Sequence, residues 1–156
     1  MRLHVLLHRP EIPPNTGNII RLCANTGAQL HLIGPLGFEL DDARLRRAGL
    51  DYHEYASLRV HDSYDACLAA IAPTRVFAFS TRATRRYDQV SYQEGDAFLF
   101  GSESSGLPAE LWARIDEAQR LRLPMREGQR SLNLSNAAAV AVFEAWRQWD
   151  FVGAKP

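Results

Sequence analysis

The chain has 156 residues, of which 46% are apolar and 23% charged, and its 18 basic residues are balanced by 18 acidic ones. A chain of this length and composition can bury a core without disulfides or metal, so residues 1–156 are predicted to form a single domain. The balanced charge argues against a surface that is basic throughout, so any contact with a polyanion would have to use local patches such as the arginines within 82–86 and 120–130.

The sequence also limits where such a protein works. No apolar run approaches the roughly 20 residues of a membrane-spanning helix. The stretch 1–7 is followed by turn-forming residues and lacks a signal-peptide cleavage site. Cys23 and Cys67 lie outside any CxxC pattern and are expected to be buried thiols in a reducing compartment. These features predict a cytoplasmic protein without membrane contact.

Apolar runs and turn residues divide the chain into alternating strands and helices. In chain order we expect a strand over 3–7, a helix capped by Asn15 or Thr16 and ended by Gly27, a strand over 29–33, a short helix from Asp41 to Gly49, a brief strand over 52–55, a helix capped by Asp62 and ending at Ile71, strands over 76–79, 97–100 and 121–123, and a long helix over 133–149. The alternation predicts an α/β fold with a mainly parallel sheet and helices on both faces.

The last helix is expected to pack on the sheet and on a partner chain. Its apolar stripe consists of Ala138, Val142, Ala145, Trp146 and Trp149. These residues recur at helical spacing and make a face wide enough for both contacts.

Three loops rich in Gly, Pro, Ser and Asn follow predicted strands, at 13–21, 101–108 and 124–136. Ligands of parallel α/β sheets bind beyond the carboxyl ends of strands, so the three loops together predict a site. The first loop matches neither GxGxxG nor GxxxxGK[ST], which disfavours a dinucleotide or P-loop site. Its Asn15 and Arg21 either bind one anionic group near the helix N-terminus or serve as a cap and a solvated surface residue.

The other two loops each leave two interpretations open. Glu103 either accepts hydrogen bonds from ribose hydroxyls or is an exposed turn carboxylate, and Gly101 and Gly106 allow close backbone approach. The polar residues within 131–136 exceed the single residue that capping of the last helix needs, which favours a binding role.

Other kinds of site have little support in the sequence. The five histidines form no HExxH motif, so no metal is expected. There is no GxSxG motif, and neither cysteine has an evident base beside it, which argues against nucleophilic hydrolysis.

The three loops resemble, in order and spacing, the three motifs of the SPOUT class of RNA methyltransferases. "PEIPPNTGNIIRLCANTG" resembles the first motif, "LFGSESSGLP" the second and "LRLPMREGQRSLNLSNAAAVAVFEAW" the third. The stretch "RLRRAGLDYHEY" is similar to that of the short, single-domain TrmL (YibK-like) tRNA 2′-O-methyltransferases. The resemblance extends from Met1 to about Val152.

This resemblance implies a SPOUT fold with a C-terminal trefoil knot, a homodimer, and S-adenosylmethionine as cofactor, released as S-adenosylhomocysteine. It implies methylation of the ribose 2′-hydroxyl of the tRNA wobble nucleotide, a cytidine or modified uridine, mainly in leucine isoacceptors. Two alternatives stay open, which are the same chemistry on another RNA such as ribosomal RNA, and a non-catalytic RNA-binding module.

The resemblance also assigns residues by motif position. The cofactor-binding set that it implies is Phe79, Ser80, Gly101, Glu103, Leu123, Met125, Ser131 and Leu132. Arg21 is implied as the catalytic residue that binds the adjoining phosphate, orients the hydroxyl and eases loss of its proton, with Asn15 on the substrate side and Asn133 and Ser135 as helpers.

The general base stays open. Phe143 stands where relatives can carry a tyrosine, so a hydroxyl contact would be lost and a stacking contact kept. Arg44, Arg46, Arg47 and the arginines within 82–86 are the expected RNA-binding patches.

Overall fold

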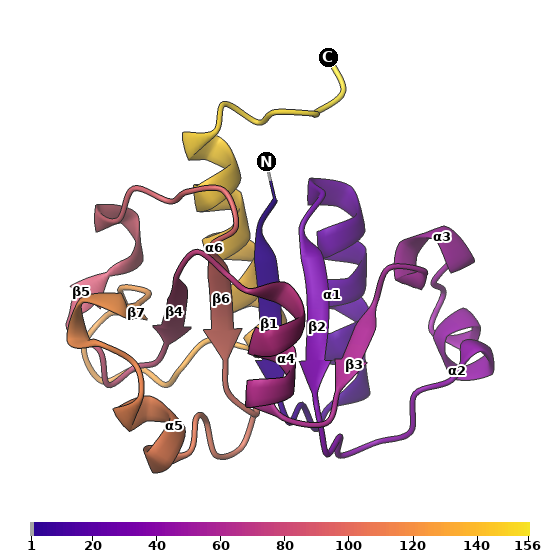
Figure 1. The fold of residues 1–156 in the computed structure, drawn as a ribbon, viewed down its shortest axis with the longest axis horizontal. Helices are drawn as coiled ribbons and strands as arrows, with labels where there is room; N and C mark the ends of the chain where they lie inside the picture. Colours follow the sequence, from indigo (N-terminus) through magenta and orange to yellow (C-terminus); the bar gives the residue numbers. More distant parts are fainter. Residues whose placement is uncertain (1) are drawn as a thin grey trace.

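A seven-stranded sheet forms the centre of the computed structural model, which describes residues 2–156 (Figure 1). The strands are β1 (His4–His8), β2 (Gln29–Ile33), β3 (Arg59–His61), β4 (Val76–Phe79), β5 (Arg85–Arg86), β6 (Ala97–Phe100) and β7 (Arg120–Arg122). They lie in the order β3-β2-β1-β6-β4-β7-β5, and each neighbouring pair is parallel, which confirms the predicted α/β fold.

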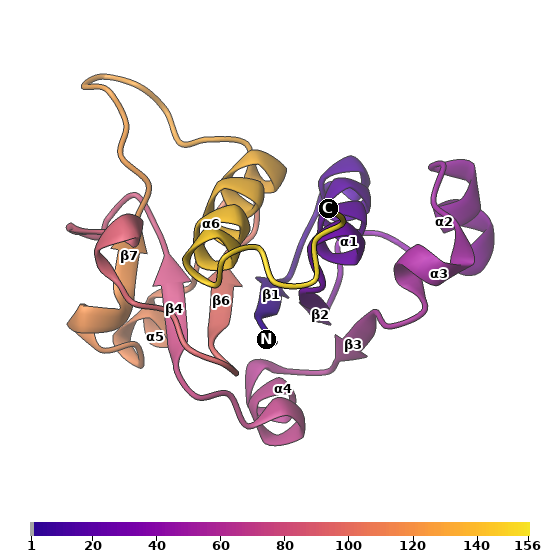
Figure 2. The same ribbon diagram turned by 90° about the horizontal axis from the view of Figure 1, so that it is seen from above.

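Helices cover both faces of this sheet (Figure 2). On one face lie α1 (Pro13–Thr26) and α6 (Leu134–Gln148), with α2 (Asp42–Arg47) and α3 (Tyr52–Tyr55) beyond α1. On the other lie α4 (Tyr64–Ile71) and α5 (Ala109–Ala113), and two short 3-10 helices cover 87–89 and 117–119. The arrangement makes two apolar layers, one on each side of the sheet.

The apolar strand runs form elements because both of their faces are buried. In β1, Val5 packs in the layer under α1 and α6, whereas its neighbour Leu6 packs under α4 and α5. Successive side chains of a strand point to opposite faces, so a parallel strand covered on both sides is apolar throughout. Burial of a leucine or phenylalanine of this kind contributes roughly 1.5–3 kcal/mol to folding.

Helix α1 begins earlier than the sequence predicted and lacks the predicted cap. It starts at Pro13, and its N-cap residue is Ile12, which has no capping side chain. Proline suits the first helical turn because its missing N–H has no partner there in any case. Asn15 and Thr16 are therefore buried within the first turn and do not precede it.

Two further predictions near the middle of the chain were wrong in detail. The expected strand over 52–55 is helix α3, in which the carboxylate of Glu54 accepts a hydrogen bond from the backbone N–H of Asp51 at 2.9 Å and satisfies a free helix donor. The expected cap of α4 at Asp62 is instead Ser63, whose hydroxyl accepts from the backbone N–H of Ala66 at 3.1 Å.

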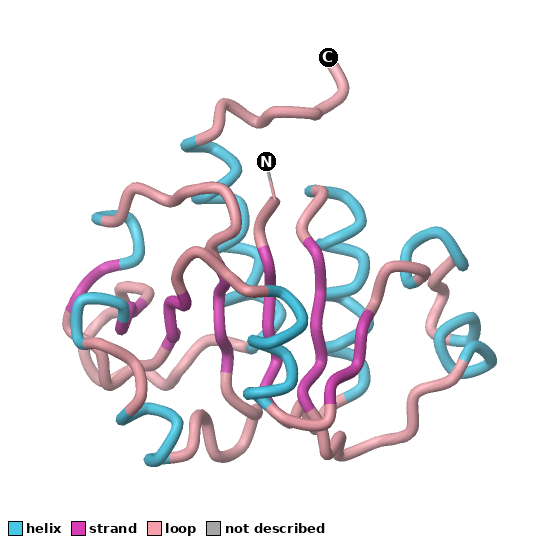
Figure 3. The backbone as a smooth tube through the Cα atoms, in the orientation of Figure 1, coloured by secondary structure: helices cyan, strands magenta, loops and turns pink. Residues whose placement is uncertain are grey.

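The remaining differences are short elements. Sequence patterns missed β3, β5 and α5, which Figure 3 shows as strands and a helix among the loops of the tube. The predicted strand over 121–123 is β7, one residue earlier, and the predicted helix over 133–149 is α6, with its N-cap at Asn133. Cys23 and Cys67 are buried as expected. Within residues 2–156, none of the helices is both long enough and apolar enough to span a membrane.

The strand order brings the ends of four strands to one edge of the sheet, and the three predicted loops follow three of these strands, β1, β6 and β7. Phe100 at the end of β6 pairs in register with Leu7 in β1 and with Phe79 at the end of β4, and Phe79 also pairs with Leu121 in β7. The chain segments that leave these four strands therefore start side by side.

Candidate active site

A cavity of about 570 Å³ lies beyond the carboxyl ends of β4, β6 and β7. Its wall comes from the segments 79–82 after β4, 100–107 around the end of β6, and 123–134 before α6, together with Ile12 and Asn15 at the start of α1. Pockets of roughly 300–1,000 Å³ suit ligands of cofactor size. Of the three loops predicted from the sequence to form one site, those at 101–108 and 124–136 line this cavity, whereas the loop at 13–21 contributes Asn15 alone.

The loop after β6 needs its first glycine. A Cβ atom on Gly101 would lie only 2.2 Å from the carbonyl carbon of Gly106 and 2.3 Å from the nitrogen of Leu107. The loop closes on itself, since the backbone N–H of Gly106 donates to the carbonyl of Ser102 at 2.9 Å, and Gly106 has a φ of +67°. Glycine is the residue that adopts such a φ without steric cost. This tight closure fixes the direction in which Glu103 projects.

Glu103 anchors the N-terminus of α1 from a distant loop. Its carboxylate accepts hydrogen bonds from the backbone N–H groups of Glu11 at 2.9 Å and Ile12 at 2.8 Å, and from Nδ2 of Asn15 at 3.2 Å. A carboxylate near a helix N-terminus satisfies free donors and interacts favourably with the helix dipole. Glu103 thus supplies the capping that the first turn of α1 lacks.

A second, reciprocal contact joins the same two loops. The carboxylate of Glu11 accepts from both the backbone N–H of Ser104 at 3.0 Å and its hydroxyl at 2.7 Å. These hydrogen bonds, the one from the hydroxyl of Ser104 first, lower the pKa of Glu11 below its ordinary value. The two loops are therefore held by a carboxylate from each side.

Asn15 connects this clamp to the third loop. Its side chain is buried, donates to Glu103 and accepts a hydrogen bond from Nδ2 of Asn133 at 3.0 Å. Oδ1 of Asn133 in turn accepts from the backbone N–H groups of Ser135 at 2.9 Å and Asn136 at 3.3 Å, and so caps α6. One chain of hydrogen bonds thus runs from the loop after β6, through α1, to the start of α6.

All of the predicted cofactor-binding residues line the cavity. They are Phe79, Ser80, Gly101, Glu103, Leu123, Met125, Ser131 and Leu132. The rings of Phe79 and Phe100 stack with centroids 4.9 Å apart and give the cavity an aromatic wall. Of the predicted substrate-side residues, Asn15 and Asn133 also line it.

Arg82 is the main cavity residue that the sequence interpretation did not assign to the site. Its guanidinium lies 4.8 Å from the ring centroid of Trp112 and donates to the carbonyl of Leu107 at 3.3 Å. Among the described residues that line the cavity, Arg82 is the only basic one, and Glu103 is the only acidic one. The position of Arg82, just past the end of β4, was the available signal, but the sequence suggested only a general basic patch.

Two of the predicted catalytic residues lie outside the cavity wall. Arg21 donates from Nε to Glu54 at 2.9 Å and from Nη2 to the carbonyl of Gly49, and its side chain is half-exposed. The hydrogen bond and charge of Glu54 raise the pKa of Arg21. Ser135 donates its hydroxyl hydrogen to Oδ1 of Asn133 at 2.6 Å and does not line the cavity. The structure therefore groups Asn15 with Asn133, and separates Arg21 from both.

Comparisons with known proteins give consistent similarities. The model of the SpoU rRNA Methylase family matches residues 2–143. The chain is 64% identical over 152 residues to the tRNA (cytidine(34)-2′-O)-methyltransferase of Burkholderia ambifaria, covering 96% of this chain and 97% of the relative. It is 55% identical over 152 residues to the protein of the same name from Escherichia coli strain K12, covering 97% of each.

Two solved structures extend these similarities. One, described as giving structural insights into the 2-OH methylation of C/U34 on tRNA, has a TM-score of 0.86 at 49% identity, with 96% of this chain and 97% of that chain covered. The other is an AdoMet-bound rRNA methyltransferase from Sinorhizobium meliloti, with a TM-score of 0.79 at 27% identity, covering 94% of this chain but 56% of that chain.

Proposed function

The chain belongs to the SpoU rRNA methylase family, and we propose that it transfers a methyl group from S-adenosylmethionine to the ribose 2′-hydroxyl of nucleotide 34 of tRNA. Relatives that are 55% and 64% identical over nearly the whole chain carry the name of this activity. The observation that carries the proposal is the cavity, because it lies at the carboxyl ends of parallel strands and brings apolar, hydroxyl, acidic and basic groups together in a space of cofactor size.

The cavity suits the chemical groups of S-adenosylmethionine. Phe79, Leu123, Met125 and Leu132 provide apolar surface for the adenine ring. Ser80, Gly101 and Ser131 bring hydroxyl and backbone groups for the ribose, and Glu103 has acceptor capacity beyond its three protein donors. Arg82 offers a cation for the carboxylate of the methionine part. When bound, this cofactor supplies an electrophilic methyl group on its sulfonium.

The chain's own residues would position the ribose. Asn15 and Asn133 each use one N–H of the side-chain amide within the protein, Asn15 toward Glu103 and Asn133 toward Asn15. A side-chain amide carries two N–H donors, so one remains on each residue for an RNA oxygen. Held at a fixed spacing, such donors can orient the hydroxyl and stabilise negative charge as its proton leaves. Ser135 would act indirectly, by fixing the side chain of Asn133.

Glu103 fits a positioning role better than that of a general base. Its oxygens already accept three hydrogen bonds from the protein, which hold the carboxylate against the start of α1. Among the described residues, no histidine lines the cavity. The proton acceptor would therefore come from the solvent or from the RNA.

Arg21 would bind the phosphate beside the reacting ribose. Its Nε and Nη2 are used by Glu54 and Gly49, which leaves the two N–H groups on Nη1 for an RNA phosphate. Arg21 follows Asn15 by six residues on α1, about 9 Å along the helix axis. In this arrangement Glu54 holds the guanidinium in place while the RNA extends from the cavity along α1.

We further infer a homodimer from the exposed apolar surface of the C-terminal region. Val140, Phe143, Phe151 and Val152 are exposed by 41–50%, and Trp146 lies between Phe143 and Phe151 with ring centroids 5.6 and 5.3 Å away. A contiguous apolar surface of this kind commonly forms an interface between protein chains. Phe143 would contribute its ring to that interface without the hydroxyl of a tyrosine.

We also propose that residues 1–156 form one SPOUT methyltransferase domain with a C-terminal trefoil knot. Its support is the position of β7, which enters the sheet between β4 and β5, the two strands that precede it in the chain. We place its work in the cytoplasm, with tRNA as partner.

The test is a methyl-transfer assay with labelled S-adenosylmethionine, on total tRNA and on ribosomal RNA in parallel, followed by nuclease mapping of the methylated ribose. Label at nucleotide 34 of tRNA, with leucine isoacceptors tested individually, is the expected result. Label in ribosomal RNA instead would show that ribosomal RNA is the substrate, whereas the proposed methyl-transfer chemistry would stand. S-adenosylhomocysteine at ~100 times its Kd should stabilise the folded chain by roughly 2.7 kcal/mol, which a thermal-shift assay measures as a higher Tm. If the chain shows no thermal shift and transfers no methyl group to any RNA, the remaining interpretation is a non-catalytic RNA-binding module.

A further inference from the structure

Three histidines from adjacent strands form a hydrogen-bonded row on the face of the sheet under α4. Nδ1 of His4 in β1 lies 3.1 Å from Nε2 of His31 in β2, and Nδ1 of His31 lies 2.9 Å from Nε2 of His61 in β3. His4 and His31 are buried, and His61 is partly exposed. The row therefore runs from the interior toward solvent at the β3 edge of the sheet.

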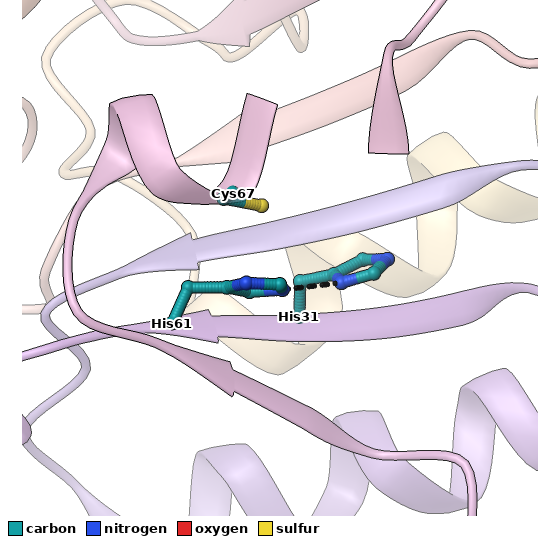
Figure 4. Close-up of side chains that lie close together, drawn as sticks. All are labelled: His31, His61 and Cys67. Carbon is teal, nitrogen blue, oxygen red and sulfur yellow. Dashed lines mark hydrogen bonds between the residues drawn. The ribbon is translucent and has the colours of Figure 1, made fainter. Parts of the chain in front are cut away.

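Cys67 of α4 lies over the outer end of this row, as Figure 4 shows. One ligand atom each from His31, His61 and Cys67 lies within 4.8 Å of the other two. Cys67 is fully buried and makes its contacts in the apolar layer under α4. A thiol and two imidazole nitrogens thus converge at a place with no role in the cavity.

We propose that His31, His61 and Cys67 form a zinc site that joins β2, β3 and α4. Zinc is bound in proteins by thiolate and imidazole ligands at roughly 2.3 and 2.0–2.1 Å in tetrahedral geometry, which puts two nitrogens about 3.3 Å apart and a nitrogen and a sulfur about 3.6 Å apart. His31 and His61 already approach at 2.9 Å, so their rings need only separate slightly. The sulfur of Cys67 lies within 4.8 Å of both nitrogens, so a shift of about 1 Å would bring it to the distance that zinc requires.

His4 strengthens this assignment because it occupies the position of an orienting partner. A metal-bound histidine almost always donates its other ring N–H to a neighbouring acceptor, which fixes its tautomer. With zinc on Nδ1 of His31, Nε2–H of His31 donates to Nδ1 of His4 over the 3.1 Å that separates them. Nδ1 of His31 and Nε2 of His61 share one proton in the metal-free chain, and on zinc binding that proton moves through solvent to the other ring nitrogen of the residue that carried it. Cys67 releases one proton to water on binding.

The site lies outside the cavity, and its position at the edge of the sheet gives it a structural role. β3 is a three-residue strand at the edge of the sheet, and it pairs with β2 alone. A metal bound by β2, β3 and α4 would fasten this edge to the helix that covers it. Water can complete the coordination from the exposed side of His61.

A second group of side chains meets the same distance criterion and serves as the competing assignment. Asp51, His53 and Glu54 also have ligand atoms within 4.8 Å of one another, but Asp51 and His53 are exposed. The Glu54 carboxylate is already bound by Arg21 and by the backbone N–H of Asp51. Exposed acidic groups of this kind commonly gather without a metal, so the buried set is the one proposed.

The experiment is titration of the chelator-treated full chain with Zn²⁺ by calorimetry, and with Co²⁺ by absorption spectroscopy. One equivalent of Zn²⁺ should bind, and Co²⁺ should give a thiolate-to-metal charge-transfer band that the Cys67→Ser variant loses. Bound Zn²⁺ should raise the Tm. His61→Ala, a change at a partly exposed site that the fold should tolerate, should weaken Zn²⁺ binding by more than about 10-fold.

Two matched variants control for the other candidates. Cys23→Ser removes the other buried cysteine, and His53→Ala removes the histidine of the exposed group, so both should bind Zn²⁺ as the unchanged chain does. Absence of Zn²⁺ binding by the unchanged chain would overturn the proposal. So would full binding by His61→Ala, or loss of binding in His53→Ala, whether or not Cys67→Ser folds.

Discussion

Asn133 donates a hydrogen bond from its Nδ2 to Oδ1 of Asn15 at 3.0 Å, across 118 residues of sequence. Asn15 passes the connection on to Glu103, and Asn133 caps α6. The three loops around the cavity therefore do not move independently, because each end of this chain of hydrogen bonds also fixes a helix terminus. A substitution at any one of these residues should therefore affect both cofactor binding and the positioning of the substrate.

Glu103→Gln should test this coupling most directly. The new amide NH2 would face backbone N–H groups of Glu11 and Ile12, so at least one donor loses its acceptor. An unsatisfied donor of this kind costs about 1–3 kcal/mol. We expect a lower Tm, weaker S-adenosylhomocysteine binding by calorimetry and a large loss of methyl transfer. Glu110→Gln, an exposed change on α5, is the control. Equal behaviour of the two variants would contradict the anchoring role.

Arg21→Ala should abolish methyl transfer while S-adenosylhomocysteine binding stays unchanged, because Arg21 lies outside the cavity wall. Loss of the ion pair with Glu54 could by itself disturb α1 and α3, so Glu54→Gln is the matched variant. It removes the same ion pair and keeps the guanidinium.

Single-turnover assays on one tRNA should then find transfer retained in Glu54→Gln and lost in Arg21→Ala. Equal losses in both variants would mean that the pairing, and not phosphate binding, is what the reaction needs. Wild-type rates in Arg21→Ala would remove Arg21 from the mechanism altogether.

Long apolar runs explain why most of the fold could be predicted. β1, β2, β4 and β6 are buried on both faces, so their sequences are mostly apolar, and the loops that follow β1 and β6 could be recognised as neighbours of a ligand. β3 and β5 contain arginine and are strands only because β2 and β7 pair with them. Such pairing depends on tertiary contacts that no local pattern records.

The same limit applied to individual side chains. Asn15 is a typical capping residue, but Ile12 occupies the N-cap position of α1. The side-chain amide of Asn15 instead donates a hydrogen bond to Glu103, 88 residues away. Arg21 meets Glu54 across 33 residues, and spacing along α1 alone could not show that contact. His31 and His61 are 30 residues apart, so a search for short histidine motifs could not join them.

Arg82→Gln should weaken cofactor binding by removing a contact with the methionine part of the cofactor. If Arg82 binds the carboxylate of the methionine group, loss of a charged hydrogen bond should reduce S-adenosylhomocysteine affinity by roughly 10-fold or more. Methylthioadenosine lacks that carboxylate and should bind both forms of the protein equally. Calorimetric titration of both ligands into both proteins makes the comparison. Equal weakening of the two ligands would mean that Arg82 supports the wall of the cavity, for example through Leu107 and Trp112.

His8 should make folding stability depend on pH. Burial first, and then the charge of Arg9, lower the pKa of His8 below its ordinary value of 6.5, against a smaller opposing effect of Glu110. The folded chain therefore keeps His8 neutral while the unfolded chain binds a proton, so stability is present above pH 6.5 and is lost as the pH falls. Urea unfolding with a chelator present, above and below this pH, should show a smaller loss for His8→Gln. An unchanged loss would contradict the assignment.

Arg126 and Arg130 should contribute to tRNA binding through salt-sensitive contacts. Both are exposed in the segment between Met125 and Ser131, which line the cavity, and within residues 2–156 neither forms an ion pair. Arg44 and Arg86, in the patches predicted from the sequence, are instead paired with acidic neighbours.

The double variant Arg126→Glu, Arg130→Glu should therefore weaken tRNA binding and reduce its salt dependence. Each phosphate contact that is lost should lower the magnitude of the log–log salt slope by roughly 0.7–0.9. Arg59→Glu, an exposed change in β3 at the far edge of the sheet from the cavity, is the control and should leave the slope as it is. Filter binding over a salt series measures both quantities, and S-adenosylhomocysteine affinity should stay constant in every variant. If the double variant keeps the full slope, the RNA approaches the cavity without touching this segment.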